Sequence, residues 1–296
     1  MKRPPADIRS DAELVAALVA EQYPSFAGPV ELVAEGWDNV IYRLGSRFAA
    51  RLPRREVAVP LIENEQRWLP TLAAVLPVII PSPLAIGRPT ARFPWPWSIV
   101  AWVEGAGLDE VAPQVRDAAA DTTADALLAL HRPAPDDAPV NRVRGVPLAD
   151  RLEAWRRNLT AAHLDGDDLT SVEAALAAGA TAASWDRDPV WVHGDLHPAN
   201  TVVDPVHGDL LSLLDFGDLC SGDPATDLAL AWTGFGPEGR ARLRQRLDAG
   251  GSYDDAIWVR ARAWAAGLAV VYLAHADDAA RMGAIARHTF TQLRLG

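Results

Sequence analysis

The stretch WVHGDLHPANTVVDPVHGDLLSLLDFGDLCSGDPATD, residues Trp191–Asp227, carries the features that decide the fold we expect. Its first loop contains His193, Asp195 and Asn200, and a further carboxylate, Asp215, follows a short apolar run. Asp195 and Asn200 are five residues apart. Loops at the ends of neighbouring strands can aim two carboxylates and a carboxamide at one point in space.

The backbone around these side chains is predicted to be loop and strand. Gly194 and Pro198 disfavour a helix, because glycine costs about 1 kcal/mol and proline about 3 kcal/mol in a helix interior. Apolar residues at 190–192, 201–203 and 210–214 indicate short strands on both sides of the loop. The polar residues therefore lie where strands end.

These residue types suit phosphoryl transfer. Asp195 would accept the proton of an acceptor hydroxyl, while Asn200 and Asp215 would hold Mg²⁺ on the phosphates of a nucleotide. HGDLHPAN followed by LDFGD resembles the aminoglycoside phosphotransferase family, which are small-molecule kinases of the protein-kinase-like fold. The resemblance implies an α+β fold of two lobes, an antiparallel sheet with a helix followed by a mainly helical lobe. It also implies an ATP-dependent enzyme, with GTP as an open alternative donor.

The chain departs from the protein-kinase pattern at Gly194, where protein kinases carry arginine. In those enzymes the arginine pairs with a phosphorylated activation loop, so we expect no such switch here. Asp227 lies only twelve positions after Asp215, too short a distance for a long segment that docks a protein substrate. We therefore expect a small-molecule acceptor.

Two other classes of protein stay open. His193, Asp195 and His197 form H-x-D-x-H, which also occurs among metal hydrolases because histidine and carboxylate are common Zn²⁺ ligands. The remaining histidines, at 131, 163, 207, 275 and 288, are scattered. The second alternative is a kinase-like module that binds nucleotide without catalysis.

Composition limits the partners. The 296 residues carry a formal net charge of −11, which disfavours nucleic acid and anionic membrane surfaces and attracts cations, although solubility alone explains it equally well. Cys220 is the single cysteine, so no disulfide can form within the chain. We see no signal-like N-terminus and no apolar run of membrane-spanning length, and we expect a cytoplasmic protein.

The first part of the chain is predicted to form a helix and a sheet. Ser10 and Glu13 form a capping box at the start of a helix over 11–22. Strands are indicated at 30–34, 40–44 and 48–52, followed by 78–80 and 97–103. By the resemblance, the lobes divide into 1–103, which binds nucleotide, and 104–296, which carries the catalytic loop and the acceptor site.

The resemblance also implies nucleotide-binding residues, which are placed by their order along the chain. Lys2 is the only lysine, so Arg51 takes the position where the family's third strand presents lysine. Its partner on a helix over 56–76 is Glu65, with Glu63 as second choice. The turn over the phosphates and the hinge to the second lobe add Gly36, Trp37, Asp38, Asn39, Val100 and Trp102.

The second lobe is predicted to be helical, and its acceptor site is the least determined feature. Helices are expected at 115–131, 148–164, 168–182, 224–234, 237–249, 254–276 and 278–294. For a cationic acceptor such as an aminoglycoside, the candidate carboxylates are Asp218, Asp223, Asp254 and Asp255. Trp155, Trp232, Trp258, Trp264 and Tyr272 would instead suit a larger, partly apolar acceptor. The resemblance also allows macrolides, tuberactinomycin-type peptides and homoserine-like or choline-like metabolites.

Two residues are expected to shape the catalytic loop. His193 is expected to orient it by hydrogen bonding. Asp227, at the start of a predicted helix, is expected to accept hydrogen bonds from backbone amides near the loop.

Overall fold

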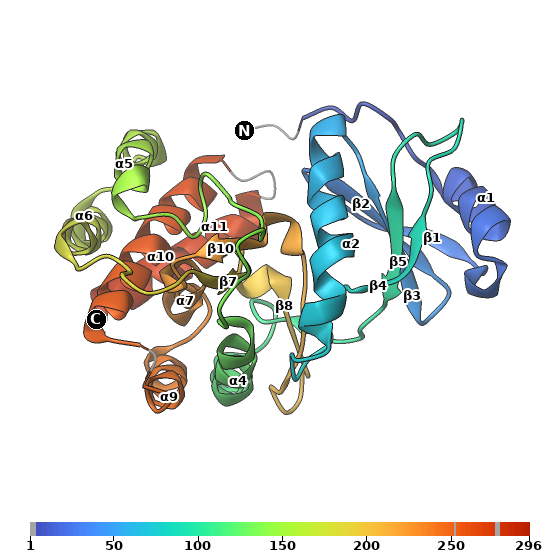
Figure 1. Ribbon diagram of the computed structural model, residues 1–296. Coiled ribbons are helices and arrows are strands. Elements are labelled where there is room, and N and C mark those ends of the chain that lie inside the picture. The colour runs from blue at the N-terminus through green and yellow to red at the C-terminus, as the bar shows by residue number, and fades with distance from the viewer. Residues whose placement is uncertain (1–3, 252, 276–278) are drawn as a thin grey trace.

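The computed structural model describes residues 4–251, 253–275 and 279–296. An antiparallel sheet fills the N-terminal region, and most of the remaining chain is helical (Figure 1). The α+β fold expected from the sequence is confirmed.

Five strands form the N-terminal sheet in the order β1-β2-β3-β5-β4, with every neighbouring pair antiparallel. Their bounds are β1 (Val30–Glu35), β2 (Asn39–Leu44), β3 (Phe48–Pro53), β4 (Pro83–Gly87) and β5 (Trp97–Ala101). Four of these lie within about two residues of the expected strands.

The expected strand at 78–80 is wrong. Ile79 instead forms a parallel bridge to Ser212 in the second part of the chain, where its amide donates to the carbonyl of Leu211 over 3.1 Å. One edge of the sheet is β4, which begins at Pro83. Proline is tolerated there because a strand's first residue and the outer side of an edge strand need no donor.

Helix α1 (Ala12–Gln22) covers one face of the sheet (Figure 1). Its N-cap is Asp11, whose carboxylate accepts the amide of Leu14 at 2.8 Å, so the expected cap at Ser10 is wrong by one residue. The Ser10 hydroxyl lies 3.2 Å from that of Tyr42 on β2 instead. Val15, Leu18 and Val19 of α1 pack with buried side chains of β2, β3 and β5 to form the sheet's own core.

Helix α2 (Val59–Ala73) lies on the other face, between the sheet and the helical part (Figure 1). A short turn of 3₁₀ helix, Glu56–Ala58, precedes it, and Pro60 occupies the first helical turn, where no amide donor is needed. The helix continues through Pro70 and ends three residues before the expected limit at 76. Its buried residues are Ile62, Glu65, Leu69 and Leu72.

The helical part contains α3 (Pro113–Ala118), α4 (Ala120–Leu130), α5 (Ala149–Ala162), α6 (Gly166–Thr181), α7 (Ala225–Leu228), α8 (Leu230–Thr233), α9 (Pro237–Asp248), α10 (Asp255–His275) and α11 (Ala279–Arg294). The helix expected over 115–131 is interrupted at Ala119, and the one expected over 224–234 at Ala229. Residues 276 and 278, the expected limits of the last two helices, lie outside the described residues.

Short strands and 3₁₀ turns hold the central loop. Strand β8 (Thr201–Val203) pairs with β6 (Ala106–Gly107) and β9 (Leu210–Leu213), and β7 (Val190–Val192) pairs with β10 (Cys220–Gly222). Single 3₁₀ turns form at η3 (Pro198–Asn200) and η4 (Phe216–Asp218). We did not expect β6 and β10, because strands of two or three residues depend on their partners and leave no periodic pattern.

Helix α10 corrects the expectation that no apolar run is long enough to span a membrane. Residues 255–274 have the length and the composition of a membrane-spanning segment, with a mean hydropathy of 1.3. However, 72% of that window is buried inside the protein, between α5, α6 and α11 (Figure 1). Trp264 of α10 packs edge-to-face on Trp155 of α5 with ring centres 4.9 Å apart. α10 is therefore the central helix of the larger core.

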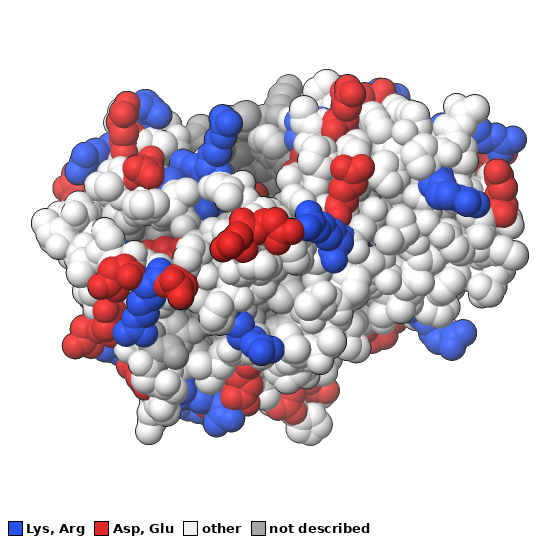
Figure 2. All heavy atoms as spheres, in the orientation of Figure 1, with Lys and Arg blue, Asp and Glu red and all other residues white. Residues whose placement is uncertain are grey.

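The two parts of the molecule meet along α2. Trp68 packs against Trp191 of β7 at 5.1 Å between ring centres, and Arg67 forms an ion pair with Asp137. On the face shown in Figure 2, acidic and basic side chains are interspersed, and wide areas over the sheet carry neither. The net negative charge does not gather into one patch on this face.

Candidate active site

The loop after β7 is fixed by His193, whose side chain is fully buried. Its Nδ1 accepts the amide of Asp195 at 3.3 Å, and its Nε2 lies 2.9 Å from the carbonyl of Leu214. An acceptor at Nδ1 and a donor at Nε2 define one neutral tautomer. His193 therefore ties the loop to the end of β9, as expected, and both ring nitrogens are used.

Asp227 holds the same loop through its backbone amides. Its two carboxylate oxygens accept the amides of His193 at 2.7 Å and Gly194 at 3.0 Å, and one of them also lies 3.1 Å from Nε2 of His131. The expected contact between Asp227 and backbone amides is confirmed. The carboxylate is completely buried, so these hydrogen bonds are its compensation for lost water.

Gly194 has a geometric reason to lack a side chain. Its φ of +87° is unfavourable for any residue with a Cβ, and a Cβ here would lie 2.3 Å from the carbonyl oxygen of Asp218. An arginine at this position, as in protein kinases, cannot be accommodated with this loop conformation.

Asp195, Asn200 and Asp215 come together at the adjoining ends of β7, β8 and β9. The Asn200 side-chain amide donates to the backbone carbonyl of Asp195 at 3.0 Å, and the amide of Leu214 donates to the carbonyl of Asn200 at 2.8 Å. Asp215 has a left-handed backbone with φ of 59°, and its side chain is 55% exposed. These contacts place Asn200 against the backbone of Asp195 and against Leu214, the residue before Asp215.

Arg51 of β3 reaches across to this region. Its Nη2 lies 2.8 Å from Glu65 of α2 and 3.3 Å from Asp215. Burial raises the pKa of Glu65 to about 7, against the opposing pull of the guanidinium. Burial also disfavours the charged guanidinium, but the carboxylates of Glu65 and Asp215 outweigh it and raise the pKa of Arg51. Of the two candidate glutamates on α2, the structure places Glu65 against Arg51 and leaves Glu63 exposed.

The turn between β1 and β2 is held by arginines that follow β3. The amide of Gly36 donates to the carbonyl of Asn39 at 2.8 Å, and Arg54 donates to the carbonyl of Gly36 at 2.8 Å. Arg55 forms an ion pair with Asp38 at 2.6 Å and donates to the carbonyl of Trp37 at 3.3 Å. The carboxylate of Asp38 is thus committed to shaping the turn.

At the expected hinge, the amide of Trp102 is already used within the chain. It donates to the carbonyl of Arg47 at 2.8 Å, so it is not free to pair with a nucleotide base. Val100 lies within the sheet, opposite Ala49 of β3. Within the described part of the chain, no oxygen accepts the amide of Val103. That amide is the better candidate for a base contact.

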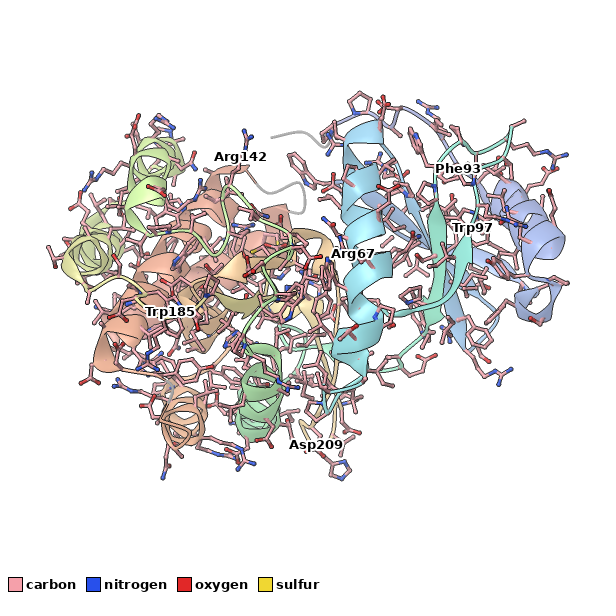
Figure 3. The ribbon with its side chains drawn as sticks, viewed as in Figure 1. Arg67, Phe93, Trp97, Arg142, Trp185 and Asp209 are labelled. Atoms are coloured by element: carbon pink, nitrogen blue, oxygen red, sulfur yellow. The ribbon has the colours of Figure 1, made fainter. Side chains whose placement is uncertain are left out.

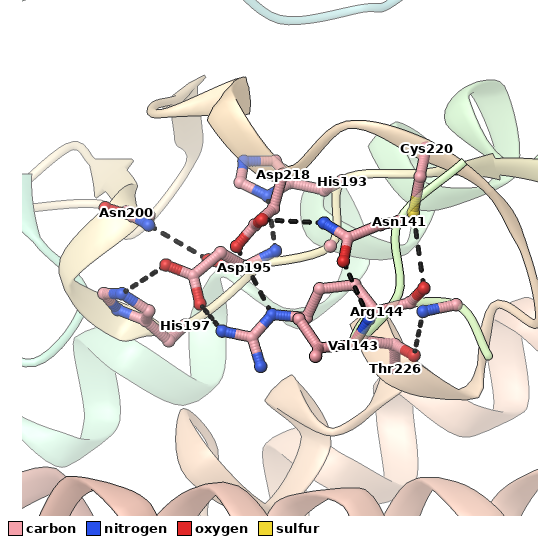
Figure 4. Close-up of polar contacts among 12 residues, drawn as sticks. Asn141, Val143, Arg144, His193, Asp195, His197, Asn200, Asp218, Cys220 and Thr226 are labelled. Carbon is pink, nitrogen blue, oxygen red and sulfur yellow. Dashed lines mark hydrogen bonds and ion pairs between the residues drawn. The ribbon is translucent and has the colours of Figure 1, made fainter. Parts of the chain in front are cut away.

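Arg144 was missed by sequence reasoning. Its Nη2 lies 2.8 Å from Oδ1 of Asp195 and its Nε lies 3.4 Å from Oδ2 of Asp218 (Figure 4). Burial alone would raise the pKa of Asp195, but the Arg144 guanidinium outweighs it, with help from His197, and holds that pKa well below its usual range. Arg144 belongs to the polar loop between α4 and α5, and no local pattern indicates a contact 51 residues further along the chain.

The candidate acceptor carboxylates separate into two groups. Asp218 lies beside the catalytic loop, where the Asn141 amide donates to it at 2.8 Å. Asp223 forms a buried ion pair with Arg260 at 2.8 Å and is not accessible to an acceptor. The assignment of Asp223 to the acceptor site is therefore wrong.

Asp254 and Asp255 lie at the far end of α10. Asp254 accepts the amide of Ile257, and Asp255 forms an ion pair with Arg244. Tyr272, near the other end of α10, packs its ring 5.8 Å from that of His197. Seventeen residues of helix separate Asp255 from Tyr272, a span of about 25 Å at 1.5 Å per residue. The assignments of Asp254 and Asp255 are also wrong.

The aromatic residues considered for an apolar acceptor are all core residues. Those that are buried in the larger core are Trp155, Trp232, Trp258, Trp264 and Tyr272. Among these, Tyr272 lies next to the loop, and its buried hydroxyl has no hydrogen-bond partner in the described structure.

A zinc site is not supported. The described residues contain no group of three or more His, Cys, Asp or Glu side chains that could hold a metal ion by themselves. Both ring nitrogens of His193 are committed to the backbone, and Nε2 of His197 lies 3.6 Å from Oδ2 of Asp195. The H-x-D-x-H spacing therefore reflects loop packing.

The fold, together with the buried Arg–Glu pair and the loop that carries Asp195 and Asn200, is that of small-molecule kinases with a protein-kinase-like fold. A model described as the phosphotransferase enzyme family matches residues 29–264, and the chain belongs to that family.

Two curated relatives match parts of the chain. An aminoglycoside 3'-phosphotransferase of Streptomyces fradiae is 30% identical over 170 residues, which are 52% of this chain and 61% of that relative. The match thus spans less than two thirds of that relative's length. The uncharacterized protein YcbJ of Bacillus subtilis (strain 168) is 27% identical over 240 residues, 73% of this chain and 71% of that protein.

Solved structures share the fold over most of the chain. The GDP complex of aminoglycoside 2'-phosphotransferase-IIIa aligns with a TM-score of 0.70 at 18% identity, over 95% of this chain and 99% of that one. A macrolide 2'-phosphotransferase type I aligns with a TM-score of 0.64 at 22% identity, over 98% of this chain and 99% of that one.

Proposed function

We propose that this protein transfers the γ-phosphoryl group of ATP, bound with Mg²⁺, to a hydroxyl of an aminoglycoside or macrolide antibiotic. The observation that carries the proposal is the contact of Arg51 with both Glu65 and Asp215. This contact joins the sheet to the turn after β9, and Leu214 in that turn bonds to Asn200 and His193 of the neighbouring loop. The contact provides a cation for phosphates on one side and oxygen ligands on the other.

The donor set fits magnesium. Mg²⁺ prefers oxygen ligands and is commonly held by one or two protein side chains together with phosphates and water. Two side-chain groups meet that requirement, the exposed carboxylate of Asp215 and the side-chain oxygen of Asn200. The side-chain nitrogen of Asn200 already donates to the loop. A bound Mg²⁺ would neutralise charge between the β- and γ-phosphates.

The roles of the chain's own residues follow from their contacts. Arg51, kept charged by its two carboxylates, binds α- and β-phosphate oxygens. Asp195 has Oδ1 on Arg144 and Oδ2 3.6 Å from Nε2 of His197, and its side chain remains partly exposed to an acceptor. Because its pKa is held low, Asp195 stays ionised and orients the acceptor hydroxyl, and it takes the proton as the bond to phosphorus forms.

The acceptor class rests on the names of similar proteins. They include an aminoglycoside phosphotransferase of known sequence and structures of aminoglycoside and macrolide phosphotransferases. ATP is the proposed donor, although neighbouring structures hold GDP as well as ADP and ATP. A nucleotide-dependent reaction of this kind belongs in the cytoplasm, and the acidic chain is not expected to engage nucleic acid or membranes.

ADP release with a panel of kanamycin, gentamicin, streptomycin and erythromycin tests the proposal, with the Asp195→Ala variant as control. We expect at least one compound to stimulate ADP release by the wild-type protein only. A nucleotide-binding module would be stabilised by Mg-ATP without releasing ADP with any acceptor. A hydrolase would release product without nucleotide, and either result would refute the proposal.

A further inference from the structure

We propose that Arg144 is a specificity-determining residue whose fixed positive charge selects acceptors that bring no additional amine beside the reacting hydroxyl. This inference rests on the proposed function, and it names the chemistry of the acceptor at the same site. It predicts that an acceptor with one amine is preferred over a polycation.

The charges beside Asp195 are already paired within the chain. Arg144 contacts the carboxylates of Asp195 and Asp218 at 2.8 and 3.4 Å (Figure 4). All three side chains are partly exposed, with 18% of Arg144, 27% of Asp195 and 33% of Asp218 accessible. An acceptor hydroxyl that approaches Asp195 therefore meets a guanidinium as well as carboxylates.

The backbone that carries Arg144 is anchored on both sides. Before it, the amide of Val143 donates to the Asn141 side chain at 2.9 Å, and that side chain donates to Asp218. After it, the amide of Gly145 donates to the Thr226 hydroxyl at 3.1 Å. These contacts define where the guanidinium lies.

Further contacts leave little room for this segment to shift. The carbonyl of Gly145 accepts the amide of Asp223 at 2.8 Å, and the thiol of Cys220 lies 3.7 Å from the carbonyl of Arg144. A Cβ added at Gly222 would lie only 2.1 Å from the Gly145 carbonyl oxygen. Arg144 is thus a fixed part of the site and does not behave as a loose side chain that an acceptor can displace at little cost.

A fixed guanidinium alters which acceptors fit. Two carboxylates without Arg144 would attract an ammonium group, as a polycationic acceptor provides. With Arg144 in place, both carboxylates are already paired, so an added ammonium group is attracted less and approaches a like charge. An acceptor that carries no charged group beside its reacting hydroxyl is not affected by the charge of Arg144.

The test compares charge variants of one loop. Arg144→Gln removes the charge, Arg144→Lys keeps it, and Arg142→Gln makes the same charge change at an exposed position two residues away (Figure 3). Calorimetric Kd values are measured for kanamycin, a polycation, and erythromycin, which has one amine, with ADP and Mg²⁺ present. Thermal unfolding confirms that each variant is folded.

We expect Arg144→Gln to tighten kanamycin binding relative to erythromycin by at least about tenfold, because the unpaired carboxylates gain a partner. Arg144→Lys and Arg142→Gln should leave the ratio of the two Kd values within about threefold of the wild type. Should Arg144→Gln fail to fold, Asp218→Asn, which removes one negative charge and keeps Arg144, should shift the ratio in the opposite direction.

The inference is overturned if the folded Arg144→Gln protein binds kanamycin no better than the wild type, or does not bind it measurably. The binding ratio is independent of turnover. A shifted ratio without phosphorylation of any compound would therefore refute the proposed function and leave the selection by Arg144 intact.

Discussion

Asp195 is the residue on which the proposed chemistry depends, and its surroundings decide its protonation. It lies between the guanidinium of Arg144 and the imidazole of His197. Arg144 keeps the carboxylate ionised even though burial favours the neutral form. An orienting group must be ionised before the acceptor arrives, and this pairing ensures it across the physiological pH range.

This pairing predicts a pH dependence. In the wild type, kcat/KM should show no loss from protonation of Asp195 down to about pH 5, because its pKa lies below that of an ordinary carboxyl group. In Arg144→Gln, no guanidinium opposes the effect of burial on Asp195, so the pKa of Asp195 rises. Activity should then fall as the pH decreases through that raised pKa. The ratio of the two profiles between pH 5 and 8 removes the titration of the nucleotide itself. Profiles that superimpose would contradict the role of Arg144.

Individual residues differ in how well the sequence predicts them. Arg51 and Glu65 could be paired because the family resemblance expects a basic residue on the third strand and a glutamate on the helix that follows, and Lys2 is the only lysine that could compete. Asp223, Asp254 and Asp255 were assigned from charge alone. Charge does not distinguish a carboxylate that awaits a ligand from one that already has Arg260 or Arg244 as its partner.

At the scale of elements, α2 carries a direct test of the Arg51 contact. Glu65→Gln should reduce the free energy of unfolding by about 1–3 kcal/mol, because a nearly buried guanidinium loses one of its two charged partners. The KM for ATP should rise as Arg51 loses its orientation. Glu63→Gln is the matched control on the same helix, and as an exposed change it should stay within about 0.5 kcal/mol. Equal effects of the two variants would argue against the pair.

The catalytic loop provides a second test at this scale. Gly194→Ala places a Cβ against the carbonyl of Asp218 in a left-handed conformation, and should cost about 2–4 kcal/mol of stability and reduce kcat. Gly45→Ala is the matched control. Its φ is also positive, at +59°, but its Cβ would meet no atom within 4 Å, so it should cost only about 1–2 kcal/mol. Chemical denaturation of both variants gives the comparison.

Elements with their own periodicity were predicted well, and elements made by contacts were not. The helices α5, α6, α9 and α11 and the strands β2 and β3 lie close to their expected limits. Strand β4 contains Pro83 and lies in a proline-rich segment that reads as loop. The apolar run at 78–80 reads as strand but bridges to β9 instead. Only the tertiary structure decides which of these two segments becomes a strand of the N-terminal sheet.

At the scale of the whole molecule, the two parts are joined by Arg51 with Asp215, Trp68 with Trp191 and Arg67 with Asp137. A nucleotide that contacts both parts should stabilise them together. At a concentration about 100 times its Kd, Mg-ATP should add about 2.7 kcal/mol to the free energy of unfolding and raise Tm by several degrees.

Removal of the metal is the control for this stabilisation. With EDTA present, most of the shift in Tm caused by ATP should disappear, since Asn200 and Asp215 would then face phosphates without a cation between them. A shift that persists unchanged in EDTA would show that these two residues do not hold the metal. Scanning calorimetry with and without Mg²⁺ makes the comparison.

The central claim is that Asp195, Asn200 and Asp215 act on one nucleotide phosphate, and transfer of a labelled γ-phosphoryl group tests it most directly. ATP labelled at the γ-phosphate is incubated with the wild type, Asp195→Ala and Asp215→Ala and with the acceptor that the panel identifies, and labelled acceptor is quantified. We expect both variants to keep their fold and to lose transfer by about 10²-fold or more. A folded variant that retains more than about a tenth of wild-type transfer would contradict the account.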